Sequence, residues 1–164
     1  MTPALSFFVP GIPKTSGSKR AFMRPGMRFP IITEDCKGSK DWRGDVKRFA
    51  LQAYSGEPME GPLELTLSFT MPRPKGHLRS NGQVKPGAPL WHEKKPDVLK
   101  MARAVEDALT GILWRDDSQI AYERLTKSYG NHIGCDIIVK RLDYFPAGTG
   151  KAAIRQHPIY EGQV

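Results

Sequence analysis

The sequence has few cysteines and lacks a long apolar segment. Cys36 and Cys135 are the only cysteines among 164 residues. Two are too few for a disulfide framework or a zinc site, so we expect reduced thiols in a cytoplasmic protein. No apolar run approaches the roughly 20 residues that cross a bilayer, and we expect neither a membrane span nor a secretory signal.

Acidic residues are the scarcer charge, with 17 Asp and Glu against 25 Lys and Arg, a net charge of +8. Such a balance predicts a polyanionic partner, most often nucleic acid, although a basic protein without that role stays open. Pro13–Pro30 contains no acidic residue and Pro72–Lys95 contains only Glu93, and we expect both segments to be irregular loops. Phe22, Met23 and Phe29 either pin the first loop onto the core or stack or wedge at an opened DNA junction. The candidate phosphate contacts are Lys14, Lys19, Arg20, Arg24, Arg28, Arg73, Lys75, Arg79, Lys94 and Lys95.

Apolar periodicity predicts the secondary structure of the remainder. The expected elements are a buried strand at Leu5–Val9, a helix at Ser39–Tyr54, a half-covered strand from Leu63 to Thr70, a helix from Val98 to Gly111, and a hairpin of Ile120–Tyr129 and His132–Tyr144 turning at Gly130-Asn131. This pattern predicts an α/β (α+β) fold, a mixed sheet of about four strands flanked by helices in the order β-α-β-α-β-β. Residues 146–164 are expected to be a tail or an arm.

The central segment, Lys94–Ile120, carries the chemistry-bearing residues. Asp97 follows Pro96 at the expected start of the helix, and Asp116 and Asp117 follow its end. Carboxylates in such an arrangement suit Mg²⁺, which prefers oxygen ligands and can activate water against a phosphodiester. The alternative is that Asp97 only caps the helix and that the acidic pair only forms a turn.

The string KPDVLKMARAVEDALTGILWRDDSQI resembles the central motif of the RusA-type Holliday junction resolvases, and FFVPGIPKTSGSKR and MPRPKGH resemble other family segments more loosely. The resemblance implies a single RusA-like nuclease domain over residues 1–145 and a homodimer that acts on branched DNA in the cytoplasm of a bacterium or a phage-infected host. It implies Mg²⁺, with Mn²⁺ as a substitute, as the cofactor. The implied residues are Asp97 and Asp117 as catalytic metal ligands, Asp116 and Asp107 as supporting ligands, and Arg103 or a nearby Lys as the cation that stabilises charge on the phosphate.

One position departs from the family motif. The second aspartate of the family falls on Leu99, its asparagine on Lys100, and its downstream lysine on Arg103. Glu106 is roughly 10 Å along the helix from Leu99, which makes it a poor direct replacement. Leucine cannot bind a cation, so the metal site is either short of a ligand, rebuilt from Glu106 or Asp107, or lost. The departure affects the expected chemistry more than the expected fold.

Three functional hypotheses follow. The first is a structure-selective, Mg²⁺-dependent endodeoxyribonuclease that resolves four-way and other branched DNA by paired phosphodiester hydrolysis, in recombination and repair or in phage DNA processing. The second is a junction-binding protein whose nuclease activity is weakened or lost because of Leu99. The third is a general basic nucleic-acid binder, which the central motif disfavours.

Overall fold

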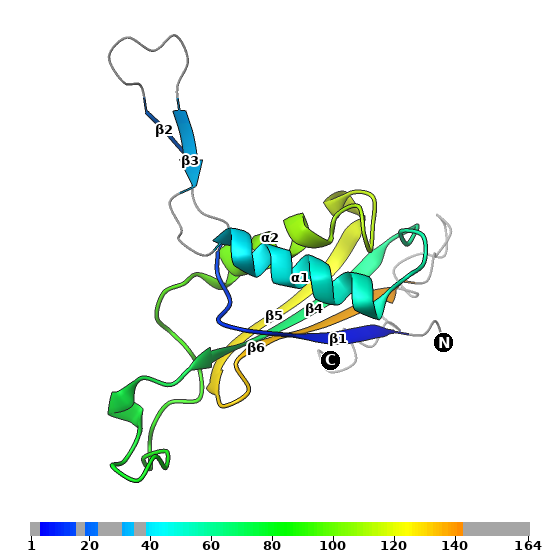
Figure 1. Cartoon of the computed structure of the whole chain (residues 1–164). Helices are drawn as coiled ribbons and strands as arrows, with labels where there is room; N and C mark the ends of the chain where they lie inside the picture. The colour runs from blue at the N-terminus through cyan, green and yellow to red at the C-terminus, as the bar shows by residue number, and fades with distance from the viewer. Residues whose placement is uncertain (1–3, 16–18, 23–30, 35–38, 143–164) are drawn as a thin grey trace, which may run out of the picture.

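The body of the protein is a four-stranded sheet with two helices packed on one face, as the computed structural model in Figure 1 shows. The structure describes residues 4–15, 19–22, 31–34 and 39–142. The elements of the body are β1 (Leu5–Pro10), α1 (Ser39–Ala53), β4 (Leu63–Pro72), α2 (Val98–Leu109), β5 (Ile120–Gly130) and β6 (Gly134–Arg141). This order and the mixed sheet confirm the predicted fold class.

The strand order in the sheet is β1-β6-β4-β5, with β4 and β5 parallel and the other neighbours antiparallel. The predicted hairpin of β5 and β6 is therefore wrong, because β4 lies between these two strands. A period of two shows that a strand has a covered face but does not show which strand it pairs with. The parallel pairing makes α2 the crossover connection from β4 to β5, so α2 runs antiparallel to both strands.

The core lies between the sheet and the two helices. Alternate residues of β4 face the helices and are buried, namely Leu63, Leu65, Leu67, Phe69 and Met71. The facing stripe of α2 consists of Met101, Ala102, Ala104, Val105, Ala108 and Leu109. Burial of each large apolar side chain stabilises the fold by about 1.5–3 kcal/mol, so this interface fixes α2 on the sheet. The predicted start of this helix is confirmed, since Asp97 is the N-cap. The helix ends at Leu109, two residues before the predicted end at Gly111, which adopts a φ of +81° in the turn that follows.

The first basic segment is not wholly irregular. Lys19–Phe22 forms β2, which pairs antiparallel with β3 (Ile31–Glu34) in a separate two-stranded sheet that stands apart from the body in Figure 1. The prediction of a loop throughout Pro13–Pro30 is thus wrong for β2. Four residues with mixed charge give too short a pattern for a strand to be recognised. Residues 23–30 and the predicted tail at 146–164 lie outside the described residues.

The second basic segment, from Pro72 to Lys95, is irregular, as predicted. It contains one short 3-10 helix, η1 (Lys75–His77), and an isolated bridge between Leu78 and Val84. Trp91 forms a bridge to Ser128, which returns the chain to the edge of β5. The segment extends well beyond the sheet in Figure 1 and then leads directly into α2. Among the described helices, none is long and apolar enough to cross a membrane.

Candidate functional site

Two charged residues of β5 lie on the face of the sheet that the helices cover. Glu123 pairs with Leu65 of β4 and Lys127 pairs with Phe69, and both of these partners are buried under the helices. Side chains alternate between the two faces of a strand, so Glu123 and Lys127 share the covered face with Leu125. Since β5 is an edge strand beside α2, the two charges define a strip along the edge between α2 and β5.

One end of this strip is acidic. The carboxyl groups of Glu106, on α2, and Glu123 are joined by a hydrogen bond. Burial raises the pKa of Glu106 to about 7, together with this hydrogen bond, the repulsion from Glu123, and the weaker repulsion from Asp117 and Asp107. The Oε1 atom of Glu123 is buried and has no hydrogen-bond partner among the described residues. We call Glu106, Glu123 and Asp117 the acidic group.

The turn that carries Asp117 is fastened to the body by its neighbours. Asp117–Gln119 is a 3-10 turn, η2, and Asp116 is its N-cap, with its Oδ1 atom accepting the N–H of Ser118 at 2.9 Å. Hydrogen bonds with Ser118 lower the pKa of Asp116. The side-chain nitrogen of Gln119 donates to the carbonyl oxygen of Met59 at 2.9 Å. Asp116 therefore shapes the turn, while Gln119 holds the turn against the segment before β4.

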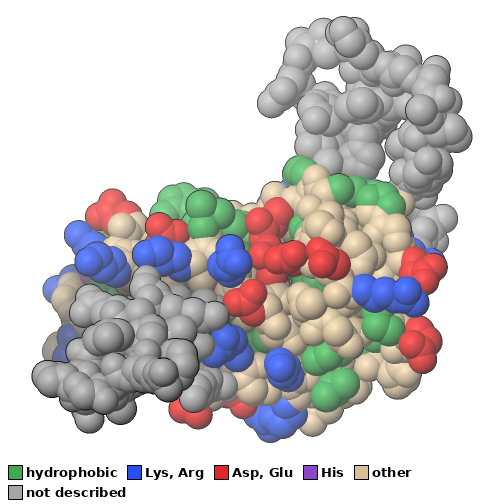
Figure 2. Space-filling model, turned by 90° about the horizontal axis from the view of Figure 1, so that it is seen from above, with side chains coloured by type: hydrophobic (Ala, Val, Ile, Leu, Met, Phe, Trp, Pro, Cys, Tyr) green, Lys and Arg blue, Asp and Glu red, His purple; other side chains and the backbone are tan. Residues whose placement is uncertain are grey.

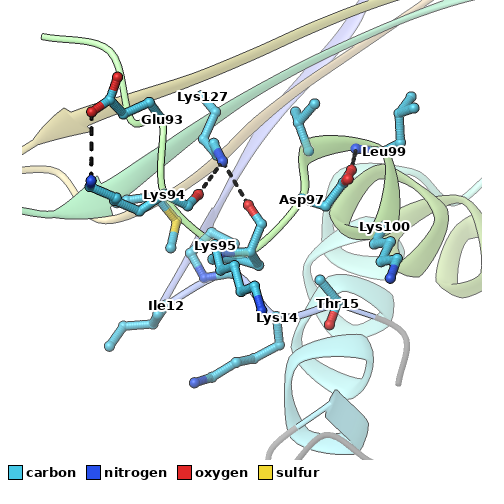
Figure 3. Close-up of a pocket in the computed structure, with 14 residues that line it drawn as sticks. Ile12, Lys14, Thr15, Glu93, Lys94, Lys95, Asp97, Leu99, Lys100 and Lys127 are labelled. Atoms are coloured by element: carbon cyan, nitrogen blue, oxygen red, sulfur yellow. Dashed lines mark hydrogen bonds and ion pairs between the residues drawn. The ribbon is translucent and has the colours of Figure 1, made fainter. Parts of the chain in front are cut away.

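The other end of the strip is basic and surrounds Asp97. The Oδ1 atom of Asp97 accepts the N–H of Leu99 at 2.9 Å, which caps α2. A pocket of about 930 Å³ lies around this helix start. Figure 3 shows its lining, which comes from the segment after β1, the segment before α2, the first turn of α2, and β5. The lysines of the lining are Lys14, Lys94, Lys95, Lys100 and Lys127, and its acidic residues are Glu93 and Asp97.

The lysines of this pocket differ in their partners. Lys127 donates to the carbonyl oxygens of Lys94 and Pro96 at 2.7 and 2.6 Å. The ammonium of Lys94 lies 3.7 Å from the carboxylate of Glu93. Three lysines remain that form no ion pair within the described part of the chain, namely Lys14, Lys95 and Lys100. Positive charge is therefore available beside Asp97, and Figure 2 shows acidic side chains gathered on one face with Lys and Arg side chains beside them.

The remaining predicted site residues lie at several places. Arg103 is exposed on α2 and lies between the two ends of the strip in sequence. Asp107 lines a separate hollow of about 420 Å³ with Arg43 and Lys47 of α1. Arg73 donates to the carbonyl oxygen of Pro89 at 2.8 Å, so it supports the irregular segment.

The other predicted phosphate contacts are spread over the two basic segments. Lys75 and Arg79 are exposed on the irregular segment before α2. Lys19 and Arg20 belong to β2, but their side chains are outside the description, and Arg24 and Arg28 lie outside the described residues altogether. Of the predicted contacts, the structure brings together Lys14, Lys94 and Lys95.

The predicted metal ligands do not form a single group. Asp97 precedes Glu106 by nine residues, which corresponds to about 13 Å along α2. Within residues 4–15, 19–22, 31–34 and 39–142, no three His, Cys, Asp or Glu side chains are arranged to hold a metal ion. The acidic group nevertheless has the chemistry that Mg²⁺ prefers, namely carboxylate oxygens, and one of these is buried without a hydrogen-bond partner in the described part of the chain. Asp117 is the predicted ligand that belongs to this group, and Asp107 lies within electrostatic range of it.

Sequence reasoning missed Glu123 and Lys127, although a signal for both was present. Their positions have the same parity as Leu125 and Tyr129, which are apolar positions of the covered face. A charged side chain at a covered position needs a partner or a function. The irregular alternation of β5 was thus a sign of charged residues placed beside α2.

The structure is therefore an α+β domain in which carboxylates and lysines lie along the edge between α2 and β5. The sequence matches the family Endodeoxyribonuclease RusA over residues 10–140, from the end of β1 to β6. The chain therefore belongs to the RusA endodeoxyribonuclease family, which is a family of Holliday junction resolving endonucleases. This match confirms the resemblance of the central motif.

A curated relative extends over nearly the same length. The uncharacterized protein YqaN of Bacillus subtilis strain 168 is 25% identical over 140 residues, which cover 84% of this chain and 96% of that protein. The two chains are thus similar over most of their lengths.

Proposed function

We propose that the chain is a Mg²⁺-dependent endodeoxyribonuclease that resolves four-way DNA by paired phosphodiester hydrolysis, in recombination and repair or in phage DNA processing. The observation that carries the proposal is the edge between α2 and β5, where an acidic group and a lysine-lined pocket occupy two ends of one strip. In a member of the RusA family, this edge offers carboxylates for a cation and lysines for a phosphate backbone.

The acidic group supplies the donors for the cation in this proposal. Glu106 and Glu123 would offer carboxylate oxygens to Mg²⁺, with Asp117 within electrostatic range of Glu106 and Asp97 as the carboxylate at the lysine-rich end of the same strip. When bound, Mg²⁺ acts as a Lewis acid that polarises a phosphoryl oxygen and makes water a better nucleophile. In the chain alone, burial and the neighbouring Glu123 raise the pKa of Glu106, so its carboxyl group binds a proton more readily than an exposed one.

The basic residues would hold the DNA backbone against the carboxylates. A strand that approaches the acidic group is repelled unless cations neutralise its phosphates, and the pocket places Lys14, Lys95 and Lys100 beside Asp97. Arg103 is exposed between the two ends of the strip and would stabilise charge on the phosphate under attack.

A second candidate function is favoured by one observation. Leu99, which occupies the position of a family aspartate, is 65% exposed on the wall of the pocket. An exposed leucine supplies an apolar surface and no ligand, which fits a junction-binding protein with weak or absent nuclease activity. This candidate shares the basic pocket with the first and differs from it only in chemistry.

We also propose that the chain acts as a homodimer. A four-way junction has two-fold symmetry, so two copies related by a two-fold axis can present one site to each of two opposed strands. Light scattering coupled to size exclusion would give twice the mass of one chain. A mass of one chain, both free and with a junction bound, would exclude the dimer.

The test of the proposed function is cleavage of a labelled four-way junction with Mg²⁺, with Mn²⁺ and with EDTA. The nuclease cuts only with a divalent cation, and Asp117→Asn abolishes cutting while it preserves binding in EDTA. Asp136→Asn is the matched control, because Asp136 is exposed on β6, away from the strip. Cutting by Leu99→Asp alone would favour the binding-only candidate for the natural chain. Failure of every form to cut would exclude the nuclease.

A further inference from the structure

The pocket at the start of α2 combines two kinds of surface. Its wall is partly apolar, and two of the apolar side chains remain accessible, with Ile12 49% and Leu99 65% exposed. Exposed branched aliphatic side chains on a pocket wall are available for a ligand. In Figure 3, Lys14 and Lys95 lie on the Ile12 side of the pocket, and Lys100 extends from the first turn of α2 near Thr15.

A ligand that fits this pocket has both an anionic and a flat apolar part. An inorganic anion would leave the apolar wall unused, and a purely apolar ligand would bury lysines without partners, which is unfavourable. A nucleotide has a phosphate for the lysines and a base face for the aliphatic side chains. The volume of about 930 Å³ is at the upper end of the range of small-ligand pockets, so it admits a nucleotide with its neighbouring phosphates.

We propose that this pocket binds one nucleotide of a DNA strand, with its base against Leu99 and the phosphates of the strand on Lys100, Lys95 and Lys14. The inference rests on the proposed function, because it assumes that DNA follows the strip between the pocket and the acidic group. Leu99 then has a positive role, since it contacts a base at the position where the family has an aspartate.

The strip also gives the position of that nucleotide. Leu99 precedes Glu106 by seven residues, or about 10 Å along α2. Successive base pairs of a duplex are 3.4 Å apart, so this distance corresponds to about three nucleotides from the phosphate at the acidic group. At a branch point, bases are more easily unstacked than in a duplex. The free-energy cost of turning a base into the pocket is therefore smaller there.

The lining favours a nucleotide within a strand over a free one. Asp97 and Glu93 are part of the lining, and their negative charge opposes a free nucleotide, which carries a doubly charged terminal phosphate. A phosphodiester carries a single charge, and the rest of the strand is held by basic residues elsewhere. Charge complementarity therefore favours a DNA strand.

The test uses the fluorescent base 2-aminopurine, placed in turn at each of the nucleotides flanking the branch point of a four-way junction. Full-length chain is added in EDTA, and binding is followed in parallel by the anisotropy of a distant label. We expect fluorescence to rise at a position within about three nucleotides of the cut phosphate, since the base leaves its stack for an aliphatic wall. Leu99→Ala should lose this rise while anisotropy still reports binding.

Leu51→Ala is the matched control, because Leu51 is 61% exposed on α1 and does not line the pocket. It should retain the rise in fluorescence. An equal rise in Leu99→Ala and in the unmodified chain, with binding intact, would overturn the inference alone. Failure of the unmodified chain to bind any junction would overturn the proposed function and the inference together.

The lysines provide an independent measurement. Lys14→Gln and Lys100→Gln should each reduce the slope of log affinity against log salt by about 0.7–0.9, the value for one lost phosphate contact. Lys140→Gln, on the exposed end of β6, should leave the slope unchanged. Unchanged slopes in both pocket variants would show that neither lysine contacts a phosphate, and would overturn the inference.

Titration with a deoxynucleoside monophosphate separates the two sources of a nucleotide. We expect it not to displace the junction at concentrations that saturate ordinary nucleotide sites. If the monophosphate binds tightly, requires Leu99, and leaves junction binding unaffected, the pocket holds a free nucleotide and the assignment to DNA is wrong.

Discussion

The ammonium of Lys127 lies 2.6 Å from the carbonyl oxygen of Pro96, and the same nitrogen lies 2.7 Å from the carbonyl oxygen of Lys94. Lys127 belongs to β5, whereas the two carbonyls belong to the last residues before α2. The backbone N–H of His92 also donates to the carbonyl oxygen of Lys127 at 3.1 Å. These three bonds fasten the end of the irregular segment to the sheet. The backbone just before Asp97 is therefore held in place where α2 begins.

The first prediction concerns this fastening. Lys127→Met keeps a long apolar side chain but removes both hydrogen bonds from the ammonium. A hydrogen bond that involves a charged group contributes about 1.5–3 kcal/mol, and the freed carbonyls regain some hydration, so we expect a loss of about 2 kcal/mol in the free energy of unfolding. Urea denaturation measures this loss. The same substitution at Lys140, which is exposed on β6, should shift the midpoint little, and equal midpoints for the two variants would contradict the role of Lys127.

The second prediction concerns the pH dependence of stability at Glu106. Its pKa is about 7 in the folded chain, above its ordinary value of 4.5, so the folded state binds more protons between these two values. The contribution of this group is therefore fully present below pH 4.5 and is lost as the pH rises through 7. Because Glu106 is only half-buried, we expect an effect of about 1 kcal/mol.

Glu106→Gln provides the measurement, since it cannot titrate. From pH 5 to pH 8, the unmodified chain should lose stability relative to Glu106→Gln in urea denaturation. Glu57→Gln, at an exposed residue in the loop after α1, is the control and should run parallel to the unmodified chain. If the difference between the unmodified chain and Glu106→Gln stays constant over this range, the raised pKa is not present in solution.

Much of the fold could be predicted because its elements have long, regular patterns. In β4, alternate apolar residues from Leu63 to Met71 are all buried, and the capping of α2 by Asp97 follows from the Pro-Asp start. The pairing of the strands could not be predicted in the same way. The turn at Gly130-Asn131 suggested a local hairpin, but β5 pairs in parallel with β4, which is far away in sequence.

The site was predicted in part, for a related reason. Asp117 and the lysines on either side of Pro96 follow from the central motif, which is continuous in sequence. The pocket also takes residues from the segment after β1 and from β5, which only the fold brings together. The hydrogen bond between Glu106 and Glu123 joins a helix to a strand and depends on how α2 lies across β5. The sequence made Glu106 a poor direct replacement at the position of Leu99 and left open a site rebuilt from Glu106 or Asp107, but it could not indicate a partner of Glu106 on β5.

The third prediction concerns Gln119, whose side chain fastens the turn of Asp117. Its amide nitrogen donates to the carbonyl oxygens of Met59 and Gly61 at 2.9 and 3.1 Å, and its amide oxygen accepts the N–H of Arg115 at 2.9 Å. Gln119→Ala removes these bonds, each of which contributes about 0.5–1.5 kcal/mol. We expect a loss of about 2 kcal/mol in stability and a loss of junction cleavage with Mg²⁺.

Gln52→Ala is the matched control, because Gln52 is exposed on α1 and lies outside the turn. Urea denaturation and cleavage assays on both variants make the comparison. Full cleavage by Gln119→Ala, at a temperature where it is folded, would show that Asp117 does not depend on this anchor.

The last prediction separates the two roles of Asp97. As the N-cap of α2, its Oδ1 atom accepts the N–H of Leu99 at 2.9 Å, and an asparagine oxygen can accept the same bond. Asp97→Asn should therefore keep the stability of the chain within about 0.5 kcal/mol, whereas Asp97→Ala should lose about 1 kcal/mol. If the charge of Asp97 also takes part in cleavage, as the family motif implies, both variants should lose cleavage with Mg²⁺ by about a hundredfold or more.

The comparison of Asp97→Asn with Asp97→Ala distinguishes a chemical role of the carboxylate from its role as a helix cap. Loss of cleavage in Asp97→Asn with stability retained assigns a chemical role to the carboxylate at the lysine-rich end of the strip. Loss in Asp97→Ala alone would make Asp97 only a cap and would leave the chemistry to the acidic group. Asn and Asp have nearly the same shape and differ by one charge, so the Asn variant tests the charge alone. Junction binding in EDTA, measured on the same variants, shows whether a loss of cleavage comes from weaker DNA binding instead.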